Sequence, residues 1–136
     1  MNPYIPLTTL DGKTVFTENG KPYIMKTNVF LELFQSKYDI CSEFNIPEET
    51  LDNVTIVLAF YEYENYSGDA TVVYRDENGI FWHVEGGHCS CYGLEDQWDP
   101  VEIGDIEIFK EYSKRMTVGY YSFGSDSKTI YDLVFN

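Results

Sequence analysis

The residues best suited to chemistry in this chain lie at and just before the stretch from Gly86 to Trp98. This stretch contains His88, Cys89 and Cys91, and His83 lies just upstream of it. Thiolate and imidazole groups are the ligands that zinc prefers, so His83, His88, Cys89 and Cys91 form a candidate zinc site. The Cys-x-Cys spacing is less common than the usual zinc knuckle, and no further Cys or His pair follows Cys91. Cys41 or a nearby carboxylate would then have to complete the site through the fold.

The same residues also allow a nucleophilic cysteine. An imidazole, either that of His88 or that of His83, can lower the pKa of the Cys89 thiol and favour the thiolate. Adjacent residues seldom have the mutual geometry of a Cys–His pair, however, and a disulfide between Cys89 and Cys91 would be strained. No Asn or Asp that would orient the imidazole is identifiable from spacing.

A structural interpretation of the stretch is favoured over both chemical ones. Gly86 and Gly87 free the backbone to leave a strand sharply, and the small residues after His88 can pack closely. Tyr92, Leu94 and Trp98 would then cover a sheet. On this interpretation the His88 side chain hydrogen-bonds to groups of the turn.

Carboxylates are dense directly after this stretch, between residues 95 and 111. They show neither EF-hand spacing nor an identifiable acid–base pair, so a solvated acidic face is favoured over a metal site. Three nearby tyrosines add rings of the kind that are enriched at protein interfaces. Together these residues form the predicted partner-binding surface: Tyr63, Tyr66, Tyr92, Glu95, Asp96, Asp99, Glu102, Asp105, Glu107 and Glu111.

The net charge of the chain limits the classes of partner. Nine Lys and Arg residues against 23 Asp and Glu residues give a formal charge of −14 at pH 7. At neutral pH this charge repels nucleic-acid phosphates and anionic lipid, whereas a basic protein surface complements it. The composition therefore disfavours direct binding to nucleic acid. It indicates a soluble acidic protein and, in the sharpest form of the hypothesis, one that imitates the charge of DNA.

Length and hydropathy predict one cytoplasmic domain. The chain has 136 residues, a size that fits one hydrophobic core. No apolar run approaches the roughly 20 residues of a membrane span, and the first residues lack the pattern of a signal peptide. An odd number of cysteines also suits a reducing compartment.

The elements that must position these side chains begin with three strands. Residues 54–62 form a continuous apolar run rich in β-branched residues, which is typical of a central strand. Residues 63–69 have the composition of a loop, and a strand at 70–75 then joins a strand at 80–85 through an Asn-Gly turn. The pattern predicts an antiparallel meander over about residues 54–85.

Further elements flank this meander. A second Asn-Gly pair, Asn19 and Gly20, predicts an N-terminal hairpin. Apolar residues three or four positions apart predict amphipathic helices at about 29–44, capped by Thr27 or Asn28, and at about 106–117, capped by Asp105. Cys41 lies on the apolar stripe of the first helix and is expected to be a small buried residue.

The segment after residue 119 is compatible with two short strands, or with one strand and a closing helix capped by Ser127. The elements together predict an α+β fold in which the two helices pack on a mainly antiparallel sheet.

Three segments of the chain resemble one set of proteins. They are residues 66–70, the turn at 76–79 and above all the sequence from His88 to Trp98, HCSCYGLEDQW. These segments are similar to small uncharacterised proteins of bacteriophages and prophages, and the resemblance covers about residues 57–102. It implies a small phage-type accessory protein in a bacterial cytoplasm, where such proteins often bind and alter a host enzyme. It implies no catalytic role for any residue.

We therefore expect a non-enzymatic acidic accessory protein without a cofactor. Its partner would be a basic host protein, such as a nuclease, a polymerase or a defence complex, which it inhibits or redirects. The alternative is a small zinc-binding protein or a cysteine enzyme centred on the His-Cys-Ser-Cys turn.

Overall fold

A mixed five-stranded sheet forms the centre of the protein. The computed structural model describes residues 7–8, 13–18, 20–90, 92–119 and 128–136. The central sheet has the strand order β4-β5-β6-β7-β8; its strands are β4 (Val29–Glu32), β5 (Thr55–Glu64), β6 (Ser67–Arg75), β7 (Phe81–Cys89) and β8 (Val101–Gly104). The β4–β5 pair is parallel and the other pairs are antiparallel. The predicted α+β fold with a mainly antiparallel sheet is confirmed.

The predicted meander is β5-β6-β7, and its strands are longer than expected. Asn65 and Tyr66 have φ angles of 52° and 65°, and Glu64 pairs directly with Ser67. Two successive residues with positive φ make a tight hairpin turn. The predicted loop at 63–69 is therefore wrong, because most of it continues β5 and β6.

The β6–β7 connection is the expected Asn-Gly turn. Gly79 has a φ of 83°. The Asp76 carboxylate accepts hydrogen bonds from the backbone N–H groups of Asn78 and Ile80 at 2.9 and 3.0 Å. It also accepts one from the indole N–H of Trp82 at 2.9 Å, so one side chain fixes both the turn and the strand that follows it.

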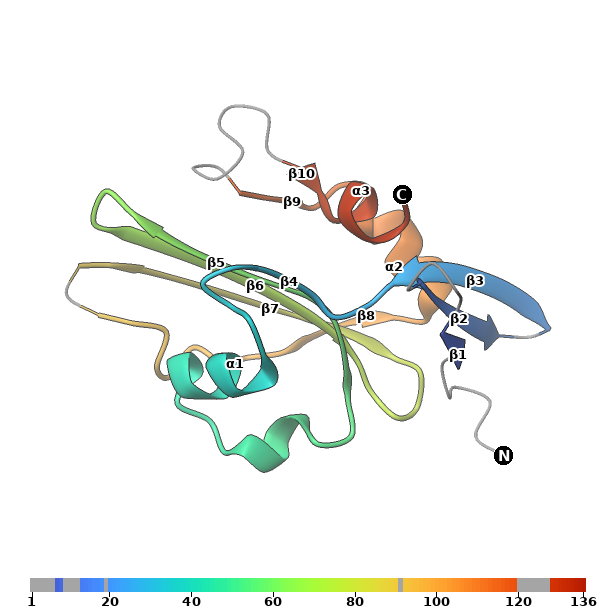
Figure 1. Cartoon of the computed structure of the whole chain (residues 1–136), viewed down its shortest axis with the longest axis horizontal. Coiled ribbons are helices and arrows are strands. Elements are labelled where there is room, and N and C mark those ends of the chain that lie inside the picture. Colours follow the sequence, from blue (N-terminus) through green and yellow to red (C-terminus); the bar gives the residue numbers. More distant parts are fainter. Residues whose placement is uncertain (1–6, 9–12, 19, 91, 120–127) are drawn as a thin grey trace.

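The N-terminal hairpin is also confirmed. Strands β1 (Leu7–Thr8), β2 (Lys13–Glu18) and β3 (Lys21–Lys26) form a separate antiparallel sheet. Glu18 pairs with Lys21, so the hairpin turns at the predicted position. Figure 1 shows this sheet at one end of the molecule, beside α2 (Ile106–Ser113).

The first predicted helix, at about 29–44, is wrong in its first half. Val29–Glu32 is β4, and α1 spans Lys37–Phe44. Asn28 and Glu32 have φ angles of 57° and 60°, which no α-helix accommodates. The N-cap is Ser36, whose hydroxyl accepts a hydrogen bond from the Asp39 N–H at 3.3 Å, and not Thr27 or Asn28. Pairing with the edge of β5 has overridden a helix-like spacing of apolar residues. A short helix, η1 (Glu48–Leu51), follows α1.

The second predicted helix is correct at its start and too long at its end. Asp105 caps α2 and accepts a hydrogen bond from the Ile108 N–H at 3.0 Å. The chain then forms β9 (Thr117–Val118), which pairs with β10 (Lys128–Thr129), and ends in α3 (Ile130–Val134). Thr129 caps α3, and Ser127 lies outside the described residues.

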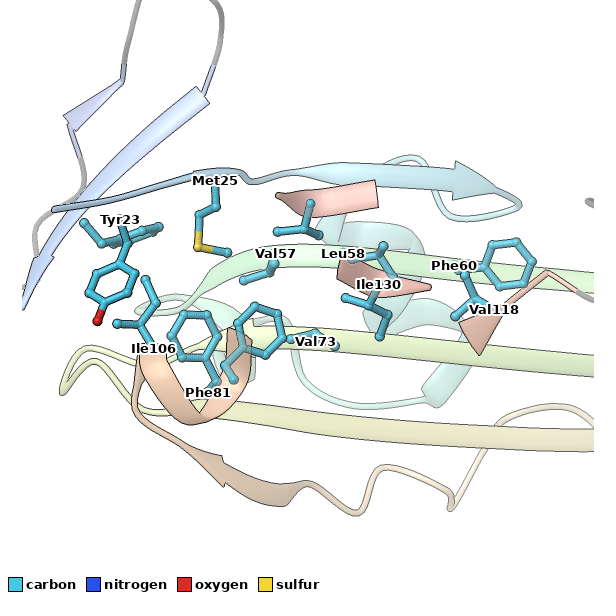
Figure 2. Close-up of a cluster of buried hydrophobic side chains, with 13 residues drawn as sticks. Tyr23, Met25, Val57, Leu58, Phe60, Val73, Phe81, Ile106, Val118 and Ile130 are labelled. Carbon is cyan, nitrogen blue, oxygen red and sulfur yellow. The ribbon is translucent and has the colours of Figure 1, made fainter. Parts of the chain in front are cut away.

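Both faces of the central sheet are covered, and each has its own hydrophobic core. Figure 1 shows α1 on one side of the sheet and β9, β10 and α3 on the other. On the side of α1, here the α1 face, Phe34, Phe44, Tyr61 and Leu94 belong to one buried cluster. On the opposite side, here the α3 face, Figure 2 shows a second cluster: Tyr23, Met25, Val57, Leu58, Phe60, Val73, Phe81, Ile106, Val118 and Ile130. No helix in the described part of the chain is long and apolar enough to cross a membrane.

Candidate functional site

The two histidines of the candidate zinc site lie on opposite faces of the same strand. Strand β7 pairs with β6 without interruption from Phe81 to Cys89. Side chains alternate between the faces of a regular strand, so residues 83 and 88 point to opposite sides. Accordingly the His88 ring contacts Tyr61 on the α1 face, whereas the His83 ring lies against Tyr112. One metal ion therefore cannot bind both imidazoles.

Both ring nitrogens of His88 form hydrogen bonds within the protein. Its Nδ1 lies 2.7 Å from the carbonyl oxygen of Cys89, which can only accept, so Nδ1 carries the proton. In the neutral ring Nε2 then accepts a hydrogen bond from the Tyr61 hydroxyl at 2.6 Å. Burial, reinforced by the charge of Glu43, raises the pKa of Tyr61 to about 12, so this hydroxyl keeps its proton at neutral pH. The His88 side chain therefore has a structural role.

The neighbouring strand leaves room for His88 only because residue 68 is glycine. A Cβ atom at Gly68 would overlap the imidazole ring of His88. The ring of Tyr63 lies on its other side, with a centroid separation of 5.0 Å. His88 is thus enclosed by β5 and β6.

The structural interpretation of the Gly86–Trp98 stretch needs two corrections. Gly86 and Gly87 do not end the strand; β7 continues through them to Cys89. Tyr92, which was expected to cover the sheet, is 71% exposed. Leu94 is fully buried, and the Trp98 ring stacks on Tyr74 with a centroid separation of 5.9 Å, so these two residues do cover the sheet.

The cysteines do not form a site within the described residues. Cys89 is exposed, and Cys91 lies outside the described residues. No three His, Cys, Asp or Glu side chains in the described part of the chain converge on a point that could hold a metal ion. Cys41 is buried on α1, as expected, and burial raises the pKa of its thiol. Zinc binding at this turn stays a prediction.

The predicted partner-binding residues fall into separate places. Tyr66 and Tyr92 are 77% and 71% exposed, and Tyr63 lies near the free end of the β5–β6 hairpin. Asp105, Glu107 and Glu111 belong to the α2 region, at the opposite end of the long axis in Figure 1. Between these groups in the sequence lie Glu95, Asp96, Asp99 and Glu102, all exposed.

Several of these carboxylates already have partners in the fold. Glu107 accepts a hydrogen bond from the Tyr23 hydroxyl at 2.6 Å, which lowers the pKa of the carboxyl and raises that of Tyr23 to about 12. Glu111 forms an ion pair with Lys114 at 3.0 Å. Glu95 accepts a hydrogen bond from the Gly93 N–H at 3.2 Å, and hydrogen bonds from the backbone lower its pKa. Asp99 lines a larger hollow, which is described next.

Two adjoining hollows on the α3 face contain carboxylates that the sequence did not single out. The first, of about 290 Å³, is lined by Glu62, Asp69, Thr71 and Glu85 among others. Glu62 and Asp69 are directly opposite each other on β5 and β6. Alternation within the strands could have identified this set, because Glu62, Asp69 and Glu85 occupy positions of one face.

The second hollow, of about 490 Å³, is lined by His83, Glu85, Asp99, Val101, Tyr112, Arg115, Met116 and Thr117. It shares Glu85 and Thr117 with the first hollow. We call the two together the acidic trough. Its carboxylates come from three strands of the sheet and from Asp99, which precedes β8.

His83 lines the second hollow and has a ring nitrogen without a hydrogen-bond partner. The residue is only 7% exposed, and its buried Nε2 atom makes no hydrogen bond. The nearest carboxylate oxygen, Oε1 of Glu85, is 3.4 Å away but outside hydrogen-bond geometry. Burial lowers the pKa of His83, and the charge of Glu85 offsets this effect only in part. His83 is therefore neutral at pH 7.

Comparison of the chain with protein-family models, with curated proteins and with solved structures finds no match. The function must accordingly be argued from the chemistry of the trough.

Proposed function

We propose that the protein is a non-enzymatic binding protein whose acidic trough receives a basic segment of a partner protein. The observation that carries this proposal is the continuity of the trough. Two hollows joined at Glu85 bring Glu62, Asp69 and Asp99 to one face of the sheet. Such a run of carboxylates along a concave surface focuses negative potential and attracts cationic groups.

The net charge of the chain favours the same class of partner. The chain has a formal charge of −14 at pH 7. Long-range attraction therefore accelerates its encounter with a basic surface, and repulsion slows its encounter with an acidic one. The trough then selects which part of the basic surface docks, because a hollow accepts a protruding segment better than a flat face does.

The biological setting follows from the resemblance of residues 57–102 to phage and prophage proteins. In that setting the partner is a basic host protein, such as a nuclease, a polymerase or a defence complex, which the bound protein inhibits or redirects in the cytoplasm. Imitation of DNA charge is the sharper version of this proposal, since those partners present surfaces that attract phosphates.

A defined polycation tests the trough directly. Isothermal titration calorimetry with an octalysine peptide is carried out at about 0.05 M and about 0.5 M salt. The Asp69→Lys/Asp99→Lys variant changes two exposed residues of the trough. The Glu48→Lys/Glu49→Lys variant makes the same charge change on exposed residues of η1.

We expect the trough variant to bind octalysine at least about tenfold more weakly than the η1 variant at low salt. Equal loss in the two variants would mean that net charge alone attracts the peptide, and would refute the trough as the binding surface. Once the trough is established, a comparison of proteins retained from a bacterial lysate by wild type and by the trough variant identifies the host partner.

A further inference from the structure

The second hollow has a charge and a set of hydrogen-bond acceptors that define its ligand more closely. We propose that this hollow, the His83 cleft, binds a single primary ammonium group, the end of a lysine side chain in the partner's basic segment. The inference deepens the proposed function and rests on it.

The charge of the cleft is the first step. Its charged side chains are Glu85 on β7, Asp99 before β8 and Arg115 after α2, while His83 is neutral at pH 7. Two carboxylates and one guanidinium leave one uncompensated negative charge. One monovalent cation restores neutrality.

The unsatisfied nitrogen of His83 is a second and independent observation. Buried polar atoms nearly always have hydrogen-bond partners, and an exception inside a hollow indicates a partner that comes from outside. Nε2 of His83 is such an exception. The side chain beside it, Glu85, is 71% exposed and is therefore able to turn toward a ligand.

The number of acceptors matches an ammonium group. A lysine ammonium has three N–H donors and no acceptor. In the tautomer that carries its ring proton on Nδ1, Nε2 of neutral His83 is one acceptor, and the exposed carboxylates of Glu85 and Asp99 are able to turn toward the same ammonium group as the other two. The remaining walls include Val101 and Met116, which suit the methylene stem of lysine.

Proton binding by His83 opposes this recognition. A protonated His83 would remove the acceptor at Nε2 and would bring the cleft, with Glu85, Asp99 and Arg115, to a net charge of zero. Binding of an ammonium group is therefore expected to weaken as the pH falls below neutrality.

The two histidines allow an NMR test with an internal control. His83 reports on the cleft, and His88 serves as the control because it lies on the opposite face. The full-length labelled protein is titrated with a capped Gly-Gly-Lys-Gly-Gly peptide, and the imidazole resonances are followed by NMR. We expect the resonances of His83 to shift and those of His88 to stay in place. The same peptide with norleucine in place of lysine should shift neither.

Matched variants locate the contact. Glu85→Gln/Asp99→Asn should weaken binding of the lysine peptide about tenfold, the effect of about two lost charge pairs. Glu64→Gln/Asp96→Asn, which removes two exposed carboxylates outside the trough, should leave the affinity unchanged.

Three results would overturn the inference: no shift of His83, an equal shift with norleucine, or tighter binding of the corresponding arginine peptide. Its failure is distinguishable from failure of the proposed function. If octalysine binds through the trough but His83 does not respond, only the ammonium site is wrong; if the trough variant binds octalysine as well as wild type does, both are wrong.

Discussion

His83 and His88 lie on the same strand, but the hydrogen bonding of their imidazole rings differs. On the α1 face the imidazole of His88 is bonded at both nitrogens and enclosed by Tyr61, Tyr63 and Gly68. On the α3 face the imidazole of His83 is almost fully buried, carries an unsatisfied nitrogen and borders two carboxylates. The first arrangement stabilises the sheet, and the second leaves a buried ring nitrogen without a hydrogen-bond partner.

The difference shows that rare residue types are a poor guide to the chemistry of this sheet. The His88-Cys89 pair is conspicuous in the sequence, yet its histidine has no free nitrogen in the fold. Strand alternation places His83 on the same face as Glu85, and both residues line one hollow with Asp99. Whether a side chain's hydrogen bonds are satisfied is therefore more informative than its rarity.

The largest expected effect comes from filling the space beside His88. Gly68→Ala places a methyl group in the position of the His88 ring and must displace it, which also breaks the bond to Tyr61. We expect a loss of about 3 kcal/mol in the free energy of unfolding, from overpacking together with the lost hydrogen bond. Urea denaturation monitored by tryptophan fluorescence measures it.

Gly87→Ala is the matched control for Gly68→Ala. Gly87 lies on the adjacent strand, and a Cβ atom there meets its nearest neighbours at 3.5 Å, an ordinary contact distance. Its expected cost is below about 0.5 kcal/mol. An equal loss in the free energy of unfolding for the two variants would show that any added methyl group destabilises the sheet. The enclosure of His88 by Gly68 would then not be the cause.

The second effect separates the two histidines directly. His88→Phe leaves the Tyr61 hydroxyl and the Cys89 carbonyl without their shared partner, and is expected to cost about 2 kcal/mol. His83→Phe removes a buried nitrogen that has no hydrogen bond, so its cost near pH 7 is expected to be close to zero or slightly favourable. The same denaturation experiment measures both. A larger loss for His83→Phe than for His88→Phe would reverse the roles assigned to the two faces.

The sequence predicted most of the fold because its strongest signals are local. Asn-Gly pairs fixed two turns, and the apolar run of residues 54–62 located the central strand. The wrong half of the first predicted helix depends on a contact between residues far apart in the chain. Val29–Glu32 has apolar residues spaced as in a helix, but pairing with β5 places it in the sheet. The turn at Asn65 and Tyr66 was missed because tyrosine rarely adopts positive φ.

The candidate site was predicted less well, for a geometric reason. Carboxylates close together in the sequence, such as Asp99 and Glu107, separate in space because β8 and the start of α2 intervene. Carboxylates far apart in the sequence, Glu62 and Asp69 among them, meet across a strand pair. The register of β5 and β6 brings these two carboxylates together, and that register depends on the hairpin turn at Asn65 and Tyr66, which the sequence analysis missed.

The smallest expected effect is the share of the pH dependence of stability that His83 contributes. Burial lowers the pKa of His83 in the folded state below its ordinary value of 6.5. Below that value the unfolded chain binds more protons than the folded chain, so the free energy of unfolding falls as the pH falls. The ordinary pKa of an unfolded histidine limits the contribution of His83 to a loss of no more than about 1.4 kcal/mol between about pH 7.5 and about pH 5.5.

Denaturation of wild type and both phenylalanine variants over this pH window isolates that contribution. Glu95 and Glu107, whose pKa values lie below 4.5, stay ionised within it and add nothing to the slope. The His88→Phe variant keeps His83 and should retain the decline, whereas His83→Phe should lose it. A decline of equal size in the His83→Phe variant would mean that His83 is not held neutral by burial, and the contrast between the two faces would then lie only in their hydrogen bonds.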